Sequence, residues 1–160
     1  MKRVSDLGRL LNCNGEPASD SLIMRANAVN GLDAMTDLLY GPGQHMAGSD
    51  MSNEDAMTYA RNSFPFGNYC IVRDWIWIDL DVTDEQRSEL AKTRRQPVIL
   101  YAHGVVIDSE RRWDVGDFVR TSPLHVFEES FHFKTLHTVY LLLGAGTRKQ
   151  ASAKTVTRIF

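Results

Sequence analysis

Residues 113–144 read WDVGDFVRTSPLHVFEESFHFKTLHTVYLLLG. Four short apolar runs in this stretch are separated by turn-prone residues at close spacing, which is typical of an antiparallel meander within a small barrel. Pro123 lacks the backbone N–H that a strand ladder needs, so we expect it at a sheet edge or a bulge. Val139–Leu143 is apolar on both faces, which predicts a central strand.

Further strands are predicted upstream of the meander. Tyr69–Val72 is apolar and β-branched, and Trp75–Leu80 is almost continuously apolar, which indicates a buried strand or an aromatic wall. Val98–Ala102 and Val105–Ile107 predict the two arms of a hairpin. Gly104 would supply the positive φ of its tight turn.

Helices are predicted mainly in the first 65 residues. Apolar residues recur at three- and four-residue spacing between Leu22 and Leu39, and residues 41–50 have the composition of a loop. Ser52 caps a second helix that runs to about residue 62. A capping box at Thr83 predicts one helix over 83–94, inserted among the strands. We therefore predict an α+β protein, with a helical region over 1–65 and a β-rich small barrel over 66–160.

Composition is that of an ordinary globular protein of 160 residues with a net charge of −2. Residues 131–160 carry five basic and no acidic side chains, whereas the rest of the chain is acidic. An acidic body does not favour nucleic-acid binding, although the basic segment keeps it possible. The apolar runs are too short for a membrane span and no secretion signal follows Met1. Cys13 and Cys70 are far apart, so we expect free thiols and a cytoplasmic protein.

A cysteine hydrolase is one alternative. Cys70 and His103 could form a nucleophile–base pair, with Asp108 or Asp117 orienting the imidazole. Cys70 lies within the apolar run YCIV, however, where a thiol is more often a small buried hydrophobe.

Other chemistry has weaker support. The histidines at 103, 125, 132 and 137 lack the spacing of a metal site, and Ser122 lacks the glycine-flanked elbow of a hydrolase nucleophile. Gly144–Lys149 is glycine-rich and basic but departs from the phosphate-loop pattern, and a hairpin turn with a solvated basic flank explains it. We expect no cofactor and no metal.

Two kinds of macromolecular partner remain. A small barrel binds single-stranded nucleic acid through stacked aromatics and a cationic groove, although aromatics at strand spacing more often fill the core. Trp75 and Trp77 lie two residues apart beside Arg73, so on a strand they would share one face, as interface anchors or as a core wall. The residues available to a nucleic acid are Phe118, Phe127, Phe131, Phe133, Tyr140, Lys134, Arg120, Arg148, Lys149, Lys154 and Arg158.

Three strings carry a resemblance to a known family. VILYAH at 98–103 continuing to Asp108, RWDVGDFVRTSPL at 112–124 and TVYLLLG at 138–144 resemble a family of short bacterial proteins of unknown function. The resemblance covers about residues 67–150. It implies a small accessory protein, often of mobile or variable gene regions, and assigns no catalytic residue.

The sequence thus favours a non-enzymatic cytoplasmic binding protein of an accessory or inhibitor/immunity type. We expect it to dock to a basic protein partner through Trp75, Trp77 and Arg73, since charge complementarity guides encounter. A nucleic-acid-binding barrel using Arg120, Arg148 and Lys149 and a hydrolase using Cys70, His103 and Asp108 remain as alternatives.

Overall fold

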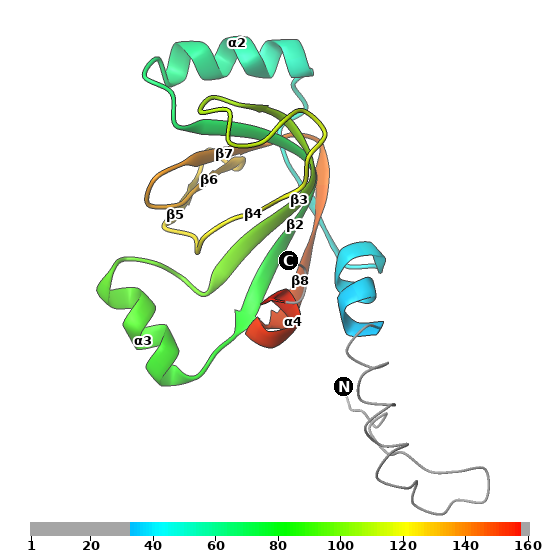
Figure 1. Cartoon of the computed structure of the whole chain (residues 1–160), viewed down its shortest axis with the longest axis vertical. Helices are drawn as coiled ribbons and strands as arrows, with labels where there is room; N and C mark the ends of the chain where they lie inside the picture. Colours follow the sequence, from blue (N-terminus) through cyan, green and yellow to red (C-terminus); the bar gives the residue numbers. More distant parts are fainter. Residues whose placement is uncertain (1–32, 158–160) are drawn as a thin grey trace, which may run out of the picture.

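The computed structural model describes residues 33–157 of the chain. Within this part an eight-stranded sheet curls into a half-barrel, with α2 across one end and α3 projecting from the other (Figure 1). Residues 33–40 are helical. The remaining elements are β1 (Gln44–Ala47), α2 (Asn53–Ser63), β2 (Tyr69–Asp81), α3 (Asp84–Lys92), β3 (Val98–Asp108), β4 (Val119–Arg120), β5 (Val126–Glu128), β6 (His132–Lys134), β7 (Val139–Leu142), β8 (Ala145–Ser152) and α4 (Ala153–Thr157).

Strand β2 is the centre of the sheet. It pairs antiparallel with β3 along one edge, and its other edge pairs in parallel with β7 and then with β8. Strands β5, β6 and β7 form an antiparallel meander, as predicted, with β7 in the interior of the sheet. The sheet as a whole is therefore mixed, whereas the sequence predicted antiparallel pairing throughout.

The segment that contains β4 and β5 pairs first with β3 and then with β6, and this brings the two ends of the sheet towards each other. The amide of Leu124 donates to the carbonyl of Val98 on β3 (2.8 Å), and the amide of the next residue, His125, donates to the carbonyl of Lys134 on β6 (2.7 Å). One continuous segment thus touches both ends of the curled sheet. The predicted α+β fold with a barrel-like sheet is confirmed.

The predicted hairpin around Gly104 is wrong. Residues 98–108 form one continuous strand, β3, and Gly104 pairs with Arg73 inside the ladder without a positive φ. The pairing of β2 with β3 does contain one irregularity, a shift of register between Ile71 and Val72. Glycine permits a turn but does not force one, and here the long partner β2 keeps the strand extended.

The predicted turn over Gly144–Lys149 is also wrong. Gly144 has φ +70°, which bends the chain, but β8 continues in the direction of β7 and pairs with the second half of β2. Residues 44–47, predicted to be loop, form the edge strand β1 on the other side of β8. The amides of Gly48 and Ser49 then bind the carbonyls of Gly144 and Leu142 at the bend (both 2.9 Å).

Helix caps follow the sequence closely. The Ser52 hydroxyl accepts a hydrogen bond from the Asp55 amide at the start of α2, and Thr83 and Gln86 form the reciprocal capping box of α3. The helical segment 33–40 is the end of the first predicted helix, whose earlier part lies outside the described residues. Val156, predicted to dock as a strand, is buried in α4, and Ile159 and Phe160 lie outside the described residues.

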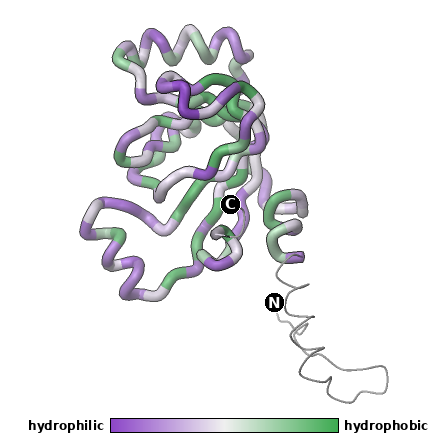
Figure 2. The backbone as a smooth tube through the Cα atoms, in the orientation of Figure 1, coloured by the Kyte–Doolittle hydropathy of each residue, from purple (hydrophilic) through white to green (hydrophobic). Residues whose placement is uncertain are grey.

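Apolar side chains pack on both faces of β2, which explains its continuous apolar run. The inner face fills the half-barrel, one part of the outer face lies under α2, and another lies under residues 33–40 and α4. Hydropathy is highest along the strands, whereas α2 and α3 are largely hydrophilic (Figure 2). Representative buried residues are Trp75, Leu100, Phe133 and Leu142 inside the half-barrel, Ile71 and Leu141 under α2, and Ile76 and Ile99 on the remaining outer face.

Helix α2 is held to the sheet partly through a buried histidine. The Tyr59 hydroxyl on α2 lies 2.8 Å from Nε2 of His132 on β6, and His132 is 5% exposed. Burial lowers the pKa of His132, and the neighbouring Lys134 cation lowers it further. A histidine with a lowered pKa is kept neutral in the folded protein, so its protonation opposes the docking of α2.

We expect the stability of the protein to fall in mild acid because of His132. Its folded pKa lies below the unfolded value of about 6.5, so the unfolded chain takes up the proton first. The stability that neutral His132 contributes is therefore fully present above about pH 6.5, and it is lost as the pH falls towards the lowered pKa of the folded state. Urea denaturation between pH 7.5 and 5 should show a smaller loss of stability for His132→Gln than for wild type, with exposed His45→Gln as the control. An equal loss in wild type and His132→Gln would contradict this assignment.

Candidate functional site

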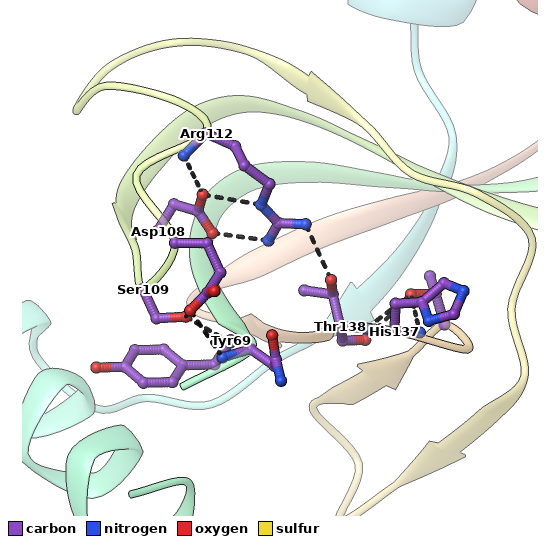
Figure 3. Close-up of polar contacts among 9 residues, drawn as sticks. Tyr69, Asp108, Ser109, Arg112, His137 and Thr138 are labelled. Carbon is purple, nitrogen blue, oxygen red and sulfur yellow. Dashed lines mark hydrogen bonds and ion pairs between the residues drawn. The ribbon is translucent and has the colours of Figure 1, made fainter. Parts of the chain in front are cut away.

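The connection between β3 and β4, residues 109–118, is fixed at its start by an ion pair whose carboxylate is buried and whose guanidinium is partly exposed. The side chain of Asp108 is fully buried, and Arg112 meets it with two guanidinium bonds, Nε to Oδ2 at 3.0 Å and Nη2 to Oδ1 at 2.8 Å (Figure 3). The Arg112 amide also donates to Asp108 Oδ2 at 2.6 Å. Bidentate arginine–carboxylate pairs are among the strongest and most directional polar contacts in proteins.

Arg112 also ties this connection to the β6–β7 turn and to an indole. Its Nη1 donates to Oγ1 of Thr138 at 3.0 Å, and its guanidinium carbon lies 4.5 Å from the centre of the Trp113 ring. Burial disfavours the charged form of Asp108, but the hydrogen bonds and charge of Arg112 outweigh this and lower the pKa of Asp108. The pair therefore stays ionised at neutral pH and holds the start of the connection in place.

A cavity of about 590 Å³ lies on the α2 side of this connection. Trp113 and Val115 from the connection face Phe64 and Tyr69 across it. Val115 is 78% exposed, and Phe66, in the short link between α2 and β2, is 95% exposed. Exposed apolar side chains that gather in one patch are a feature of many binding surfaces.

A second cavity, of about 690 Å³, lies on the other side and shares Trp113 with the first. It is lined by a continuous row of rings. Tyr40 stacks on His103 (5.3 Å between ring centres), His103 meets Tyr101 edge to face (4.9 Å), and Tyr101 stacks on Phe118 (5.9 Å). Tyr40 is 74% and Phe118 46% exposed. We call the surface formed by Phe66, Trp113, Val115, Phe118 and Tyr40 around the two cavities the loop face.

The predicted nucleophile–base pair is not assembled. Cys70 is fully buried and faces the interior of the half-barrel, whereas His103 lies on the outer face between Tyr40 and Tyr101. Cys70 pairs with Asp108, and His103 lies five residues from Asp108 on β3, roughly 16 Å along the strand. Burial and the charge of Asp108 raise the pKa of Cys70 to about 12. A thiol in that state is fully protonated at neutral pH and is no nucleophile.

The other partners of that alternative are occupied as well. Asp108 is bound by Arg112, and the Nε2 atom of His103 donates to the carbonyl of Leu39 at 3.0 Å. Asp117 does not approach the thiol either, since it lines the second cavity. The described geometry therefore does not bring Cys70, His103 and Asp108 together as the predicted catalytic group.

The predicted tryptophan anchors are core residues. Trp75 is 1% and Trp77 is 7% exposed, both inside the half-barrel, and the indole N–H of Trp75 donates to the carbonyl of Leu143 at 3.2 Å. They do share one face of β2, as predicted, but this face is the inner one. Arg73 instead points to the outside, where Nε binds Oδ1 of Asn53 at 2.7 Å and Nη2 binds the Met51 carbonyl at 3.1 Å.

Three basic residues of the predicted nucleic-acid surface make contacts within the protein, whereas Arg158 lies outside the described residues. Arg148 pairs with Asp79 (2.6 Å) and lies over the Trp77 ring, and Nη1 of Arg120 donates to the Val156 carbonyl at 3.4 Å. Lys149 binds the carbonyls of Asp37, Leu38 and Gly41, at the end of the helical segment 33–40. Of the aromatics, Phe133 and Tyr140 are buried. These contacts stabilise the junction of β8 and α4 with their neighbours.

The described residues contain no group of three or more histidine, cysteine or acidic side chains arranged to hold a metal ion. None of the helices in residues 33–157 is long and apolar enough to cross a membrane.

The loop face was missed in the sequence because its aromatics occur singly between turn residues. The sequence predicts Phe118 as a base-stacking residue or as core, and it places Trp113 and Val115 in the meander. The available signal was the composition of WDVGDF, where two aromatics and a valine alternate with aspartate and glycine. Large apolar residues in a turn-rich segment cannot all enter the core, so some of them remain at the surface.

A search with protein-family models matches residues 46–158 of the chain. The matching model describes a domain of unknown function, DUF6957, and it includes β2, β3, the connection 109–118 and all later strands. Searches of curated proteins and of solved structures find no match. The expected membership in a family of unknown function is thereby confirmed: this chain belongs to the DUF6957 family.

Proposed function

We propose that this protein is a non-enzymatic binding module that docks to another protein through the loop face. The observation that carries the proposal is the gathering of exposed apolar side chains around one well-anchored connection. Tyr40, Phe66, Val115 and Phe118 are each between 46% and 95% exposed and flank two cavities that share Trp113. Interface centres are rich in tyrosine, tryptophan and other large aromatics set in such hollows.

Charge around the loop face favours a basic partner. Arg112 is neutralised by Asp108, which leaves Glu110, Asp114 and Asp117 against Arg111 within the connection. An excess of carboxylates around an apolar centre attracts a partner with lysines or arginines at the matching rim. An accessory or inhibitor/immunity role in the cytoplasm fits such a module, and an unpaired thiol at Cys70 fits a reducing compartment.

The test is capture of a partner by the tagged full chain from a lysate of the cells that make it, with and without nuclease. The protein recovered is then purified, and its direct affinity is measured for wild type and for the double variant Tyr40→Ser/Val115→Ser. Both positions are more than 70% exposed, so the fold should be retained. We expect affinity to fall at least tenfold, since truncating two anchors each costs about 1–2 kcal/mol.

Leu136→Ser is the matched control. Leu136 is 42% exposed in the β6–β7 turn, and it lines neither cavity, so its replacement should leave affinity unchanged. Equal affinity in wild type and the double variant would overturn the loop face as the docking surface. Recovery of nucleic acid alone, with binding that weakens steeply with salt, would replace the proposal by nucleic-acid binding.

A further inference from the structure

We propose that the second cavity is a binding site for one basic side chain of the docked partner, held over the ring row by the carboxylate of Asp117. This inference rests on the proposed docking function and adds the chemical identity of the group that the cavity accepts. Three observations support it: the ring row itself, the placement of Asp117, and a lining without lysine or arginine among residues 33–157.

The ring row offers faces suited to a cation. Tyr40, His103, Tyr101 and Phe118 contact one another in sequence at 4.9–5.9 Å, and Trp113 closes the same cavity. The faces of aromatic rings carry partial negative charge and attract ammonium and guanidinium groups. The same connection already holds one such contact, because the guanidinium of Arg112 lies over the Trp113 ring.

The rings are positioned before any ligand arrives. The Nε2 atom of His103 donates to the Leu39 carbonyl, which fixes the imidazole between Tyr40 and Tyr101. Tyr101 is 5% exposed and belongs to the outer-face core, so it anchors the row. A site that is already ordered loses little conformational entropy when a ligand binds.

Asp117 is held at the cavity by backbone contacts. The Gly116 amide donates to the Val105 carbonyl, and the Val105 amide donates to the Asp117 carbonyl, both at 2.8 Å. One carboxylate oxygen, Oδ2, accepts a hydrogen bond from the Asp114 amide at 2.9 Å. Within the described residues the other oxygen has no hydrogen-bond partner, so it can meet a cation.

The described lining of the second cavity favours a cation. Asp117 supplies its one carboxylate, and no lysine or arginine of residues 33–157 lines the cavity. Burial, together with the neighbouring Tyr40, raises the pKa of Tyr101, so this phenol stays neutral at physiological pH. A guanidinium or ammonium group would find both ring faces and a carboxylate here, whereas a phosphate would meet the like charge of Asp117.

The experiment titrates the isotope-labelled full chain with the peptide acetyl-Gly-Arg-Gly-amide, monitored by NMR. The chain has three tryptophans, and only Trp113 lines the cavity, so its indole N–H signal reports on the site. We expect a saturable shift of the Trp113 signal, with the Trp75 and Trp77 signals unchanged. The same peptide with neutral citrulline in place of arginine should give no saturable shift.

Asp117→Asn is the discriminating variant, because asparagine keeps an oxygen for the Asp114 amide but removes the charge. We expect it to weaken binding of the arginine peptide about fivefold, as for an exposed cation contact. Glu85→Gln, which removes an equal charge on the distant helix α3, should change it less than twofold. Equal binding of the citrulline peptide, equal effects of the two charge variants, or no shift of the Trp113 signal would each overturn the inference.

These outcomes separate the inference from the proposed function. If the peptide does not bind but Tyr40→Ser/Val115→Ser still abolishes partner binding, docking stands and the basic-side-chain site is wrong. If the peptide binds as expected but the double variant docks like wild type, the cavity is a cation site outside the docking surface. In that case the proposed function fails.

Discussion

Gly146→Ala is expected to destabilise the protein by about 3 kcal/mol or more, the cost of forcing an extra methyl group into a packed core. An added Cβ at Gly146 would lie within 3.0 Å of three atoms of the Trp75 indole. That ring is 1% exposed and fixed by its hydrogen bond to Leu143, so it has no free space to move into. Chemical denaturation monitored by circular dichroism would give the loss directly.

Gly104→Ala is the matched control for Gly146→Ala. Both glycines lie within strands that pair with β2. At Gly104 an added Cβ meets nothing within 4 Å and the φ angle is not positive, so alanine fits without strain. We expect stability to be unchanged or to rise by up to about 1 kcal/mol, because alanine restricts the unfolded chain. Equal effects at the two positions would show that Trp75 does not cover Gly146 as described.

Trp75→Ala is expected to cost about 3–5 kcal/mol, the usual range for deleting a large buried aromatic. The side chain fills the middle of the half-barrel, and its removal also leaves the Leu143 carbonyl without its donor. Since domains of this size are stable by about 5–15 kcal/mol, the variant should unfold at a much lower urea concentration. Trp75→Phe, which restores most of the apolar volume, should recover part of the loss.

The same variant also decides between core and interface roles for Trp75. If Trp75 is a core residue, Trp75→Ala should lower the urea midpoint of unfolding in the absence of any partner. A Trp75→Ala protein with wild-type stability but weakened docking would contradict its placement inside the half-barrel. Partner affinity measured on Trp75→Phe provides the comparison if the alanine variant does not fold.

Local signals in the sequence were sufficient for several elements. The caps at Ser52 and Thr83 mark where α2 and α3 begin, because a side-chain oxygen there satisfies a backbone amide regardless of tertiary context. The apolar run over Trp75–Leu80 correctly indicated a buried strand. Its burial on both faces is what removed the alternation that normally identifies a strand.

Pairings between distant segments could not be predicted in this way. Gly104 and Gly144 both have the freedom of a turn residue, yet one remains in a straight strand and the other bends a chain that keeps its direction. In each case the deciding contact is with β2, far away in the sequence. Strand β1 was missed because its short sequence, QHMA, has no apolar alternation and gains its pairing only from β8.

The candidate site was the least predictable part of the molecule. Composition identified Trp75 and Trp77 as interface anchors or core wall with equal support, since large aromatics serve both purposes. Only the fold shows that the inner face of β2 points into the half-barrel. Two of the exposed aromatics, Tyr40 and Phe118, are 78 positions apart in the sequence and are connected through His103 and Tyr101.

The central position of β2 has a consequence for how the chain folds during synthesis. Strands β2 and β3 leave the ribosome close together, but the other edge of β2 stays unpaired until β7 and β8 have been synthesised. Ile76 of β2, for example, pairs with Thr147 of β8. Until those last strands emerge, an apolar strand is open on one side, and open edges recruit other chains. Parallel pairing between distant segments is also slow to form. Completion of the half-barrel therefore waits for the synthesis of β8, and until then the unpaired edge of β2 is exposed to pairing with other chains.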